Sequence, residues 1–326
     1  IAGYDIDEKS KFAYEYNNDA RFILKDIKEI EDDEILGLYP SDTDIKVLIG
    51  CAPCQPFSTY SHKYQNNENT IKKMDLLDCF GRQVELVKPD IVSMENVPQM
   101  QKREVFHRFR TLLEKNGYKV TYKVVYAPDY GVPQTRKRLV LLASKFGDIS
   151  LIEPEFNSDT HPTLRDTIGK LPEIRAGETH EHDPLHRSRN LSDLNLKRIR
   201  QSKPGGTWRD WDDDLLLEAY KKDSGKSFGS VYGRLEWDKP ANTITTQFPG
   251  IGNGRFGHPE QDRALSLREG ALLQTFPLNY EFVNPKQGRN YPISQVALQI
   301  GNAVPPKLGE VIGKSILRHL EEVNNV

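Results

Sequence analysis

The 326-residue sequence predicts an α/β fold built on a doubly wound, mostly parallel sheet, with a second, smaller and irregular domain. Three observations predict it. In the first half, short apolar runs alternate with amphipathic segments, as the crossover helices of parallel sheets require. From about residue 150 the chain is richer in Pro, Gly, His and clustered charge, and clear periodicity is lost. A helical pattern returns over Ser294–Leu320, with Pro305 and Pro306 where a helix would begin.

The apolar runs and the amphipathic segments define the elements in order. Strands are expected at Ala2–Asp5, Lys46–Ile49, Ile91–Met94, Tyr118–Tyr126 and Leu139–Ala143. Helices are expected near Glu8–Tyr16, Leu76–Val87 and Val105–Lys115. Because the last helical segment can pack back onto the first sheet, we expect a catalytic domain over 1–150 plus 286–326. Residues 151–285 then form a separate domain.

The composition excludes several classes of protein. Lys and Arg number 45 against 47 Asp and Glu, so the net charge is only −2. No run approaches the roughly 20 apolar residues of a membrane span. Three cysteines make a poor disulfide framework for this length, and no signal peptide is visible. These features predict a cytoplasmic protein.

A cysteine follows the second apolar run, on a turn made rigid by two prolines. Val47–Gly50 leads into Pro53-Cys54-Gln55-Pro56. Open α/β sheets bind ligands at the carboxyl ends of their strands, so a sulfur placed there can meet a substrate. We therefore interpret Cys54 as a nucleophile.

Two further segments offer chemistry that a nucleophile needs. The apolar run from Asp90 ends in Glu95 and Asn96, so a buried strand delivers a carboxylate at its carboxyl end. In Gln134-Thr-Arg136-Lys-Arg138, alternate residues of an extended segment share a face, so both arginines can point at one anion or carbonyl. Taken singly, Glu95 is explained equally well as an ordinary surface charge, and the arginine segment as a charged entrance to a sheet.

Four segments, in this order, resemble the motifs of the DNA (cytosine-5) methyltransferases: Gly50–Ser58, Glu95–Val97, Gln134-x-Arg136-x-Arg138 and Gln299–Val304. The resemblance spans nearly the whole chain. It implies a bacterial enzyme with a Rossmann-like methyltransferase fold that methylates C5 of cytosine in a specific short duplex DNA sequence. It also implies S-adenosyl-L-methionine as the methyl donor, S-adenosyl-L-homocysteine as the product, and no metal. A restriction endonuclease acting on the same site is the implied partner, with the enzyme in the bacterial cytoplasm, associated with the nucleoid through DNA.

The resemblance assigns catalytic roles to four residues. The thiolate of Cys54 would add to C6 of a flipped-out cytosine, while Glu95 holds and protonates N3. Arg138 and Arg136 would contact the O2 side of the base. The order of events is physically sound, because C5 is a poor nucleophile until C6 is saturated, and covalent catalysis divides one hard step into two easier ones. Rotating the base out of the stack costs about a few kcal/mol.

The resemblance also assigns the cofactor pocket. Asp5 would bind the ribose, Ile6 would pack on the adenine, and Asp26 with Ile27 would lie near the adenine amino group. Further cofactor contacts fall to Pro53, Leu76, Asn302 and Val304. The Phe-x-Gly-x-Gly loop that precedes the acid in this family does not occur between Ile1 and Asp5. In dinucleotide-binding folds the acid follows the glycine turn by about 20 residues, which would place this loop before Ile1, on the same chain or on a separate polypeptide.

Residues 151–285 are the expected target-recognition domain. Glycine-rich loops at Lys203–Arg209 and Gln247–His258 carry basic and aromatic residues that can approach base edges, although glycine clusters also mark ordinary turns. A basic block extends from His186 to Arg209. The DNA-contacting residues expected here and beside the nucleophile are Gln55, Ser58, Lys72, Lys73, Gly205, Gly206, Arg209 and Arg255.

Three alternatives remain open from the residues. Cys51-Ala-Pro-Cys54 is also the C-x-x-C pattern of thiol oxidoreductases. A zinc site would need Cys51 and Cys54 together with the distant His182 and His186, and would silence the nucleophile. The third alternative is that the chain is the DNA-binding subunit of a split methyltransferase, which is inactive without a partner that carries the glycine loop.

Overall fold

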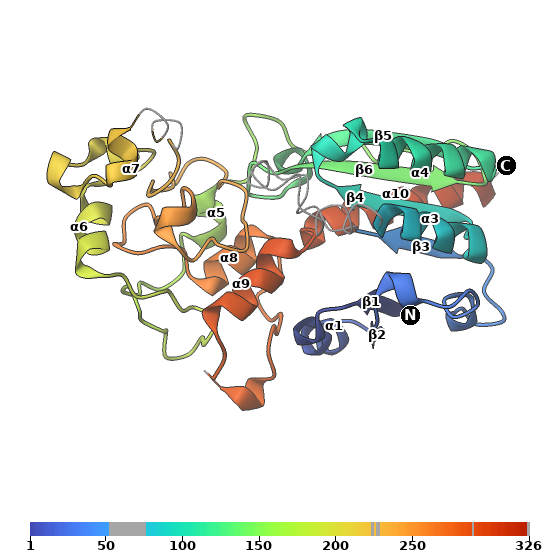
Figure 1. Ribbon diagram of the computed structural model, residues 1–326, viewed down its shortest axis with the longest axis horizontal. Coiled ribbons are helices and arrows are strands. Elements are labelled where there is room, and N and C mark those ends of the chain that lie inside the picture. Colours follow the sequence, from blue (N-terminus) through green and yellow to red (C-terminus); the bar gives the residue numbers. More distant parts are fainter. Residues whose placement is uncertain (52–75, 223–224, 226–228, 289, 325–326) are drawn as a thin grey trace. The chain divides into compact units, whose positions relative to one another are not determined.

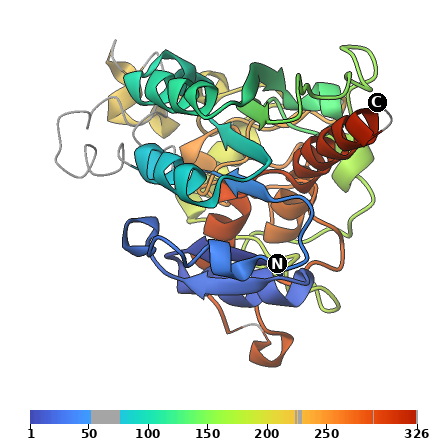
Figure 2. The ribbon, with the colours of Figure 1, turned by 90° about the vertical axis from the view of Figure 1, so that its right-hand side faces the viewer.

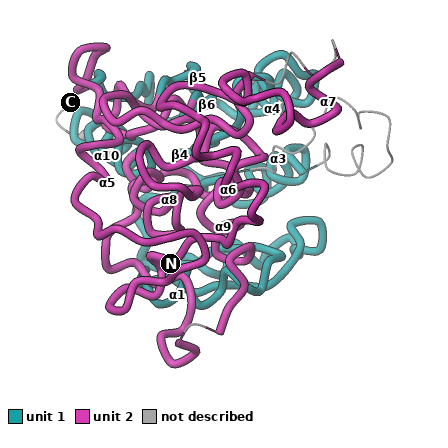
Figure 3. The backbone as a smooth tube through the Cα atoms, turned by 90° about the vertical axis from the view of Figure 1, so that its left-hand side faces the viewer, with its two compact units in different colours: residues 1–126, 137–154, 308–326 teal, residues 127–136, 155–307 magenta. Residues whose placement is uncertain are grey.

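The computed structural model describes residues 1–51, 76–222, 225, 229–288 and 290–324. The chain divides into two compact units (Figure 3). The first comprises residues 1–126, 137–154 and 308–326, and the second comprises residues 127–136 and 155–307. This division does not test the assignment of 151–285 to target recognition, which stays a prediction.

The described part of the first unit contains two sheets (Figure 1). One holds two parallel strands and the other has the order β3-β4-β6-β5, in which β3 and β4 are parallel while β6 is antiparallel to both neighbours. The strands are β1 (Ala2–Asp5), β2 (Arg21–Leu24), β3 (Val47–Gly50), β4 (Ile91–Asn96), β5 (Lys119–Tyr126) and β6 (Lys137–Ser144).

Helices cover both faces of the larger sheet. All six residues of β4 are buried, as expected for a strand covered on both sides. Figure 2 shows α3 and α4 on one side of the sheet and α10 on the other. His319 of α10 bonds Ser144 at 2.8 Å, so the predicted return of the carboxy-terminal helix to the first sheet is confirmed. The helices of this unit are α1 (Lys11–Asn17), α3 (Leu76–Val87), α4 (Glu104–Lys115) and α10 (Pro306–Asn324).

The predicted α/β alternation is confirmed, with two differences. The five predicted strands occur within two residues of their expected bounds, but β2 was not predicted. In addition, β6 runs antiparallel to its neighbours. The reason is the connection from β5 to β6, which has no α-helix and is too short for the crossover of a parallel pair.

The second unit has little regular structure. Its largest core gathers residues from α8, α9 and the loops around them, among them Phe248, Leu273 and Ile300. Capping residues fix where its short helices begin. At the start of α8, for example, Ser266 and Glu269 form a capping box. The helices are α5 (Leu164–Ile168), α6 (Asp193–Gln201), α7 (Glu218–Lys221), α8 (Leu267–Leu273) and α9 (Ile293–Asn302).

Buried charged side chains hold the loops of the second unit together. Arg234 is 4% exposed, and its guanidinium donates to the carbonyls of Ile199, Ser202, His258 and Gln261 and to Asp262. One side chain thus satisfies four carbonyls of separate loop segments.

A second buried network surrounds Glu269, which accepts two hydrogen bonds of 2.7 Å from Arg263. Burial would raise the pKa of Glu269, but the bonds and charge of Arg263 hold it at about 2. His258 lies 3.8 Å from Glu269, and burial lowers its pKa to about 4. Glu269 is therefore ionised and His258 neutral at pH 7.

Candidate cofactor pocket and catalytic pair

A cavity of about 580 Å³ lies between β1 and β3 in the first unit. Five of the residues predicted to bind a cofactor line it. They are Asp5, Ile6, Asp26, Ile27 and Leu76. The structure therefore brings these five side chains to one cavity of a size that suits a small-molecule ligand.

The two acids reach the cavity from neighbouring parallel strands. Asp5 ends β1 and pairs in register with Leu24, and Asp26 follows Leu24 by two residues. Parallel strands present their carboxyl ends at the same sheet edge, so both carboxylates lie at the ligand-binding edge. Each also orders its own turn, because Asp5 accepts from the amide of Asp7 at 2.8 Å and Asp26 from that of Lys28 at 3.0 Å.

A charged group beside the cavity was not predicted. Lys25 contacts Glu34 at 2.5 Å, and the hydroxyl of Tyr4 donates to the same carboxylate at 3.0 Å. Burial, together with the bond to Glu34, raises the pKa of Tyr4 to about 12. Tyr4 could have been singled out because it precedes the predicted Asp5. Glu34 could not, because it lies in an acidic stretch and nothing in the sequence distinguishes it from its neighbours.

Helix α3 forms another wall of the cavity. Leu76, Phe80 and Gln83 lie on one helical face and line it. A Cβ atom at Gly50 would lie 2.7 Å from ring carbons of Phe80, so only glycine allows β3 to approach this helix. The amide of Gln83 is buried, and neither of its polar atoms has a hydrogen-bond partner among the described residues.

Two predicted catalytic residues form an ion pair. Glu95 of β4 pairs in register with Val140 of β6, and Arg138 lies two residues away on the same face. Its Nε is 2.8 Å from a carboxylate oxygen of Glu95, and the two side chains are only 12% and 11% exposed. The two opposite charges therefore lie together at the carboxyl end of β4.

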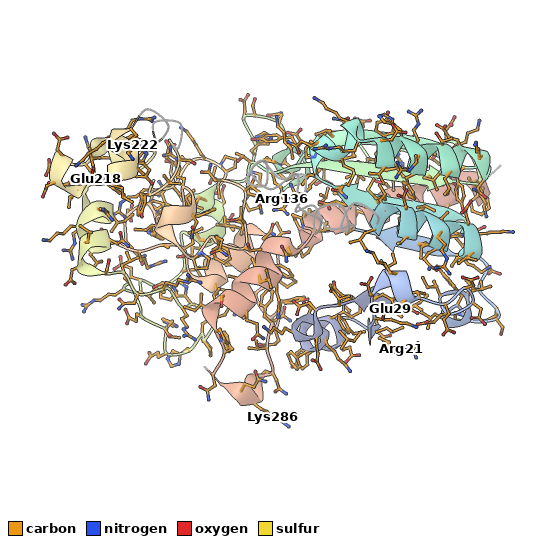
Figure 4. The ribbon with its side chains drawn as sticks, in the orientation of Figure 1. Arg21, Glu29, Arg136, Glu218, Lys222 and Lys286 are labelled. Carbon is orange, nitrogen blue, oxygen red and sulfur yellow. The ribbon has the colours of Figure 1, made fainter. Side chains whose placement is uncertain are left out.

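Arg136 has different partners from Arg138. Its side chain is buried (labelled in Figure 4) and donates to the carbonyl of Ile244 at 3.1 Å and to that of Ala303 at 3.5 Å, within the second unit. The chain is not extended over residues 132–136, so alternation does not describe this segment. Turn bonds link Gln134 to Val132 and Arg136 to Gln134, and the strand begins only at Lys137.

Gln134 holds this segment in the second unit. Its amide nitrogen donates to the carbonyl of Leu273 at 2.8 Å and to Gln274 at 2.7 Å, and its oxygen accepts from the amide of Ile244 at 3.0 Å. The first residue of the Gln-x-Arg-x-Arg motif thus has a bracing role, which spacing alone did not reveal.

The predicted nucleophile lies outside the described residues. The same holds for Pro53, Gln55, Ser58, Lys72 and Lys73. The last described residue before them is Cys51, which is exposed and follows the end of β3. Gly50 pairs with Met94, so this end of β3 lies beside Glu95.

The predicted DNA-contacting residues of the second unit fall in one loop system. Arg255 donates to the carbonyl of Gly206 at 2.8 Å, and Gly205 has a φ of +73°, which favours glycine. The guanidinium of Arg209, an exposed residue, lies 5.0 Å from the ring of Trp208. Three arginines of the basic block have structural partners, because Arg187, Arg198 and Arg200 bond Tyr291, Leu215 and Asp262.

Asn302 and Val304, the remaining predicted cofactor residues, belong to the second unit. Asn302 ends α9 and is exposed, and Val304 is half-buried.

Comparison with known proteins identifies the family. Residues 1–318 match the model of the C-5 cytosine-specific DNA methylases. The chain belongs to this family. It is a DNA (cytosine-5-)-methyltransferase, and its substrate is DNA, so the predicted family and enzyme class are confirmed.

The relatives agree with this family. The chain is 52% identical to the type II methylase M.HgiDII of Herpetosiphon aurantiacus over 98% of this chain and 89% of that protein. It is 31% identical to the type II methyltransferase M1.HphI of Haemophilus parahaemolyticus, over 92% and 75% of the two chains. Among solved structures, a protein described as a DNA modification methyltransferase of an E. coli prophage superposes with a TM-score of 0.71 at 21% identity, covering 98% of this chain and 92% of that one. The predicted fold class is therefore confirmed.

The described residues contain no group of three or more His, Cys, Asp or Glu side chains placed to hold a metal ion. In that part of the chain no helix is both long enough and apolar enough to cross a membrane.

Proposed function

We propose that this chain transfers a methyl group from S-adenosyl-L-methionine to C5 of a cytosine within a specific short duplex DNA sequence. The observation that carries the proposal is the buried Glu95–Arg138 pair, at the carboxyl end of the strand beside the one that leads to Cys54. The names of the relatives support a type II restriction–modification setting, in the bacterial cytoplasm, with an endonuclease that cleaves the same site.

The residues around the cavity suit the cofactor. The carboxylates of Asp5 and Asp26 can accept hydrogen bonds from ribose hydroxyls and an amino group. Ile6 and Ile27 offer apolar surface to a purine ring, and Leu76 adds to it. Pro53, Asn302 and Val304 are the further contacts we assign. The cofactor supplies the methyl group, and the residues of this chain prepare the base that receives it.

Cys54 is the residue we assign to attack. Only Ala52 and Pro53 lie between it and Cys51, which limits the distance between the Cα atoms of the two cysteines to about 10 Å. Its thiolate would form a bond to C6, and the displaced electron pair would move toward N3. After C5 accepts the methyl group, loss of the C5 proton and cleavage of the C6–sulfur bond would restore the aromatic ring and the thiolate.

Glu95 would hold N3 and supply its proton. In the free chain the Nε of Arg138 lies 2.8 Å from the carboxyl group of Glu95. A flipped cytosine would offer its O2 to Arg138 and its N3 to Glu95, so the two side chains that lie together here would contact neighbouring atoms of one base. Arg136 would act on the same side of the base.

DNA recognition is assigned to residues 151–285, and the catalytic domain to 1–150 with 286–326. Within 151–285, Gly205, Gly206, Arg209 and Arg255 would meet base edges, where an arginine can bond guanine with both its nitrogens. Beside the nucleophile, Gln55, Ser58, Lys72 and Lys73 would contact the target strand. The target base must rotate out of the duplex, at a cost of about a few kcal/mol.

Bisulfite sequencing of DNA from cells that express the complete gene tests this function. The expected result is full protection of one cytosine in a single recurring sequence, absent with Glu95→Gln. Scattered or absent protection with an intact, expressed protein would contradict the proposal. Leu278→Gln, an exposed change in the second unit, is the matched control.

A further inference from the structure

The small sheet of the first unit carries two of the acids assigned to the cofactor at its end (Figure 1). Asp5 is the last residue of β1, and Asp26 follows β2 by two residues. At this end the amide of Lys25 donates to the carbonyl of Asp5 at 3.2 Å. A sheet of two strands is at best marginally stable by itself. The positions of the two carboxylates therefore depend on other contacts that hold the strand ends together.

The residues that precede the two acids share a face of this sheet. The register of the strands places Tyr4 and Lys25 on one face. Each of them directly precedes one of the acids. Because successive strand residues point to opposite faces, the carboxylates of Asp5 and Asp26 project from the other face.

A single carboxylate joins Tyr4 to Lys25. The hydroxyl of Tyr4 donates to one oxygen of Glu34 at 3.0 Å, and the ammonium of Lys25 contacts the other oxygen at 2.5 Å. The bond to Lys25 lowers the pKa of Glu34, so this carboxylate is charged at neutral pH. Glu34 thus links the residue before one acid to the residue before the other.

The segment that carries Glu34 is anchored in the first unit. Its next residue, Ile35, is buried and packs in one cluster with Val87 of α3. Tyr4 packs against the same cluster, and so does Ile27, which lines the cavity. The contacts of Glu34 therefore tie the end of the small sheet to a segment held by α3, the helix that forms another wall of the cavity.

We propose that Glu34 is a positioning residue for cofactor binding. By bonding Tyr4 and Lys25 together, it fixes the distance between the two carboxylates on the opposite face. Under the proposed function, on which the identity of the ligand rests, one carboxylate meets the ribose and the other the adenine amino group. A change in their spacing would weaken both contacts of the same ligand. Glu34 is not among the residues that line the cavity, so it acts through its two partners.

Binding of S-adenosyl-L-homocysteine, measured by isothermal titration calorimetry without DNA, tests this role. In the protein expressed from the complete gene, Glu34→Ala should raise the dissociation constant about fivefold. Glu34→Gln retains an acceptor for the hydroxyl of Tyr4 and should raise it less than about twofold. The KM for S-adenosyl-L-methionine should rise with the dissociation constant, while kcat at saturating cofactor stays within about twofold of the wild type. An equal loss in KM and kcat would indicate general damage to the fold and would contradict a positioning role.

Asp32→Asn is the matched control. It removes one negative charge from the same acidic segment, and with it an exposed ion pair to Arg82, which joins the segment to α3 instead of to the small sheet. Its dissociation constant should be that of the wild type. Equal effects of Asp32→Asn and Glu34→Ala would show that the charge of the segment matters and not the bonds of Glu34, and would overturn the proposal.

Amide hydrogen exchange without ligand tests the same bonds independently of the cofactor. The amide of Lys25 donates across the two strands, and that of Lys28 donates to Asp26 at 3.0 Å. Both should exchange about tenfold faster in Glu34→Ala than in the wild type, and at unchanged rates in Asp32→Asn. Unchanged exchange in Glu34→Ala would overturn the proposal. If the wild type binds S-adenosyl-L-homocysteine and Glu34→Ala binds it as tightly, the role of Glu34 is disproved alone, whereas a wild type that does not bind it disproves the proposed function as well.

Discussion

The two units of this protein are stabilised in different ways. In the first, strands and helices satisfy most of the backbone, and the core residues around β4 are aliphatic and aromatic. In the second, irregular loops leave carbonyls that no ladder satisfies, and buried side chains such as Arg234 and Gln134 bond them instead. Buried backbone groups require partners in either case. An irregular domain can therefore be ordered when polar side chains satisfy the backbone groups that helices and sheets would otherwise satisfy. Its stability then depends on a few individual side chains.

Replacing Arg234 should have the largest effect. Arg234→Met removes the donors for four carbonyls and Asp262, and should destabilise the second unit by about 4 kcal/mol, the usual cost of breaking a buried charged network. Urea unfolding measures the change. Arg200→Met is the control, because Arg200 is exposed and pairs with the same Asp262, so its loss should cost less than about 1 kcal/mol. Equal losses in the two variants would contradict the contrast between the units.

Acid should weaken the second unit through His258. Burial holds its pKa near 4 in the folded chain, against an ordinary value of 6.5, so the unfolded chain binds the proton first as the pH falls. The contribution of His258 is complete above pH 6.5 and is lost progressively toward pH 4, by about 3 kcal/mol in total. Glu269, with a pKa of about 2 against 4.5, adds its own loss only below pH 4.5.

A pH series of urea unfolding curves measures this loss. His258→Asn retains an acceptor for the amides of Glu260 and Gln261 and should flatten the curve between pH 4.5 and 6.5. An unchanged slope in that variant would place the titrating group elsewhere.

A substitution at Gly50 tests how far the stability of the first unit depends on close packing, in contrast to the polar side chains that stabilise the second unit. Gly50→Ala places a Cβ 2.7 Å from ring carbons of Phe80, and overpacking of this kind costs about 2 kcal/mol. Thermal unfolding should show the loss, and Phe80→Leu in the same chain should recover part of it. Gly37→Ala is the control, since a Cβ there meets no atom within 4 Å.

The smallest effect is expected at Glu34. Glu34→Gln removes the charge that helps to raise the pKa of Tyr4, which should fall from about 12 toward its ordinary value of 10. Ultraviolet titration of the tyrosinate signal, with Tyr4→Phe to identify the band, measures this shift. A Tyr4 pKa that stays near 12 would assign the whole shift to burial.

The sequence predicted the first unit far better than the second. Apolar runs and helical periodicity located β1, β3, β4 and α3 because burial imposes those patterns, and they placed Glu95 at the carboxyl end of β4. The pairing of Glu95 with Arg138 was not predicted, because it depends on the register of β4 with β6. The burial of the Gln83 amide without a partner among the described residues, and the bond from Tyr4 to Glu34, were not predictable, since both depend on contacts between distant segments. Alternation did not predict the carbonyl partners of Arg136, because two tight turns interrupt the extended chain before β6.

The most direct test of the central claim uses duplex DNA that carries 5-fluorocytosine at the target position. Fluorine at C5 cannot leave as a proton does, so an adduct between Cys54 and C6 would persist. With S-adenosyl-L-methionine and the complete protein, we predict a protein–DNA complex that survives denaturation and is absent with Cys54→Ser. A protein that methylates ordinary target DNA yet forms no such complex would contradict the account.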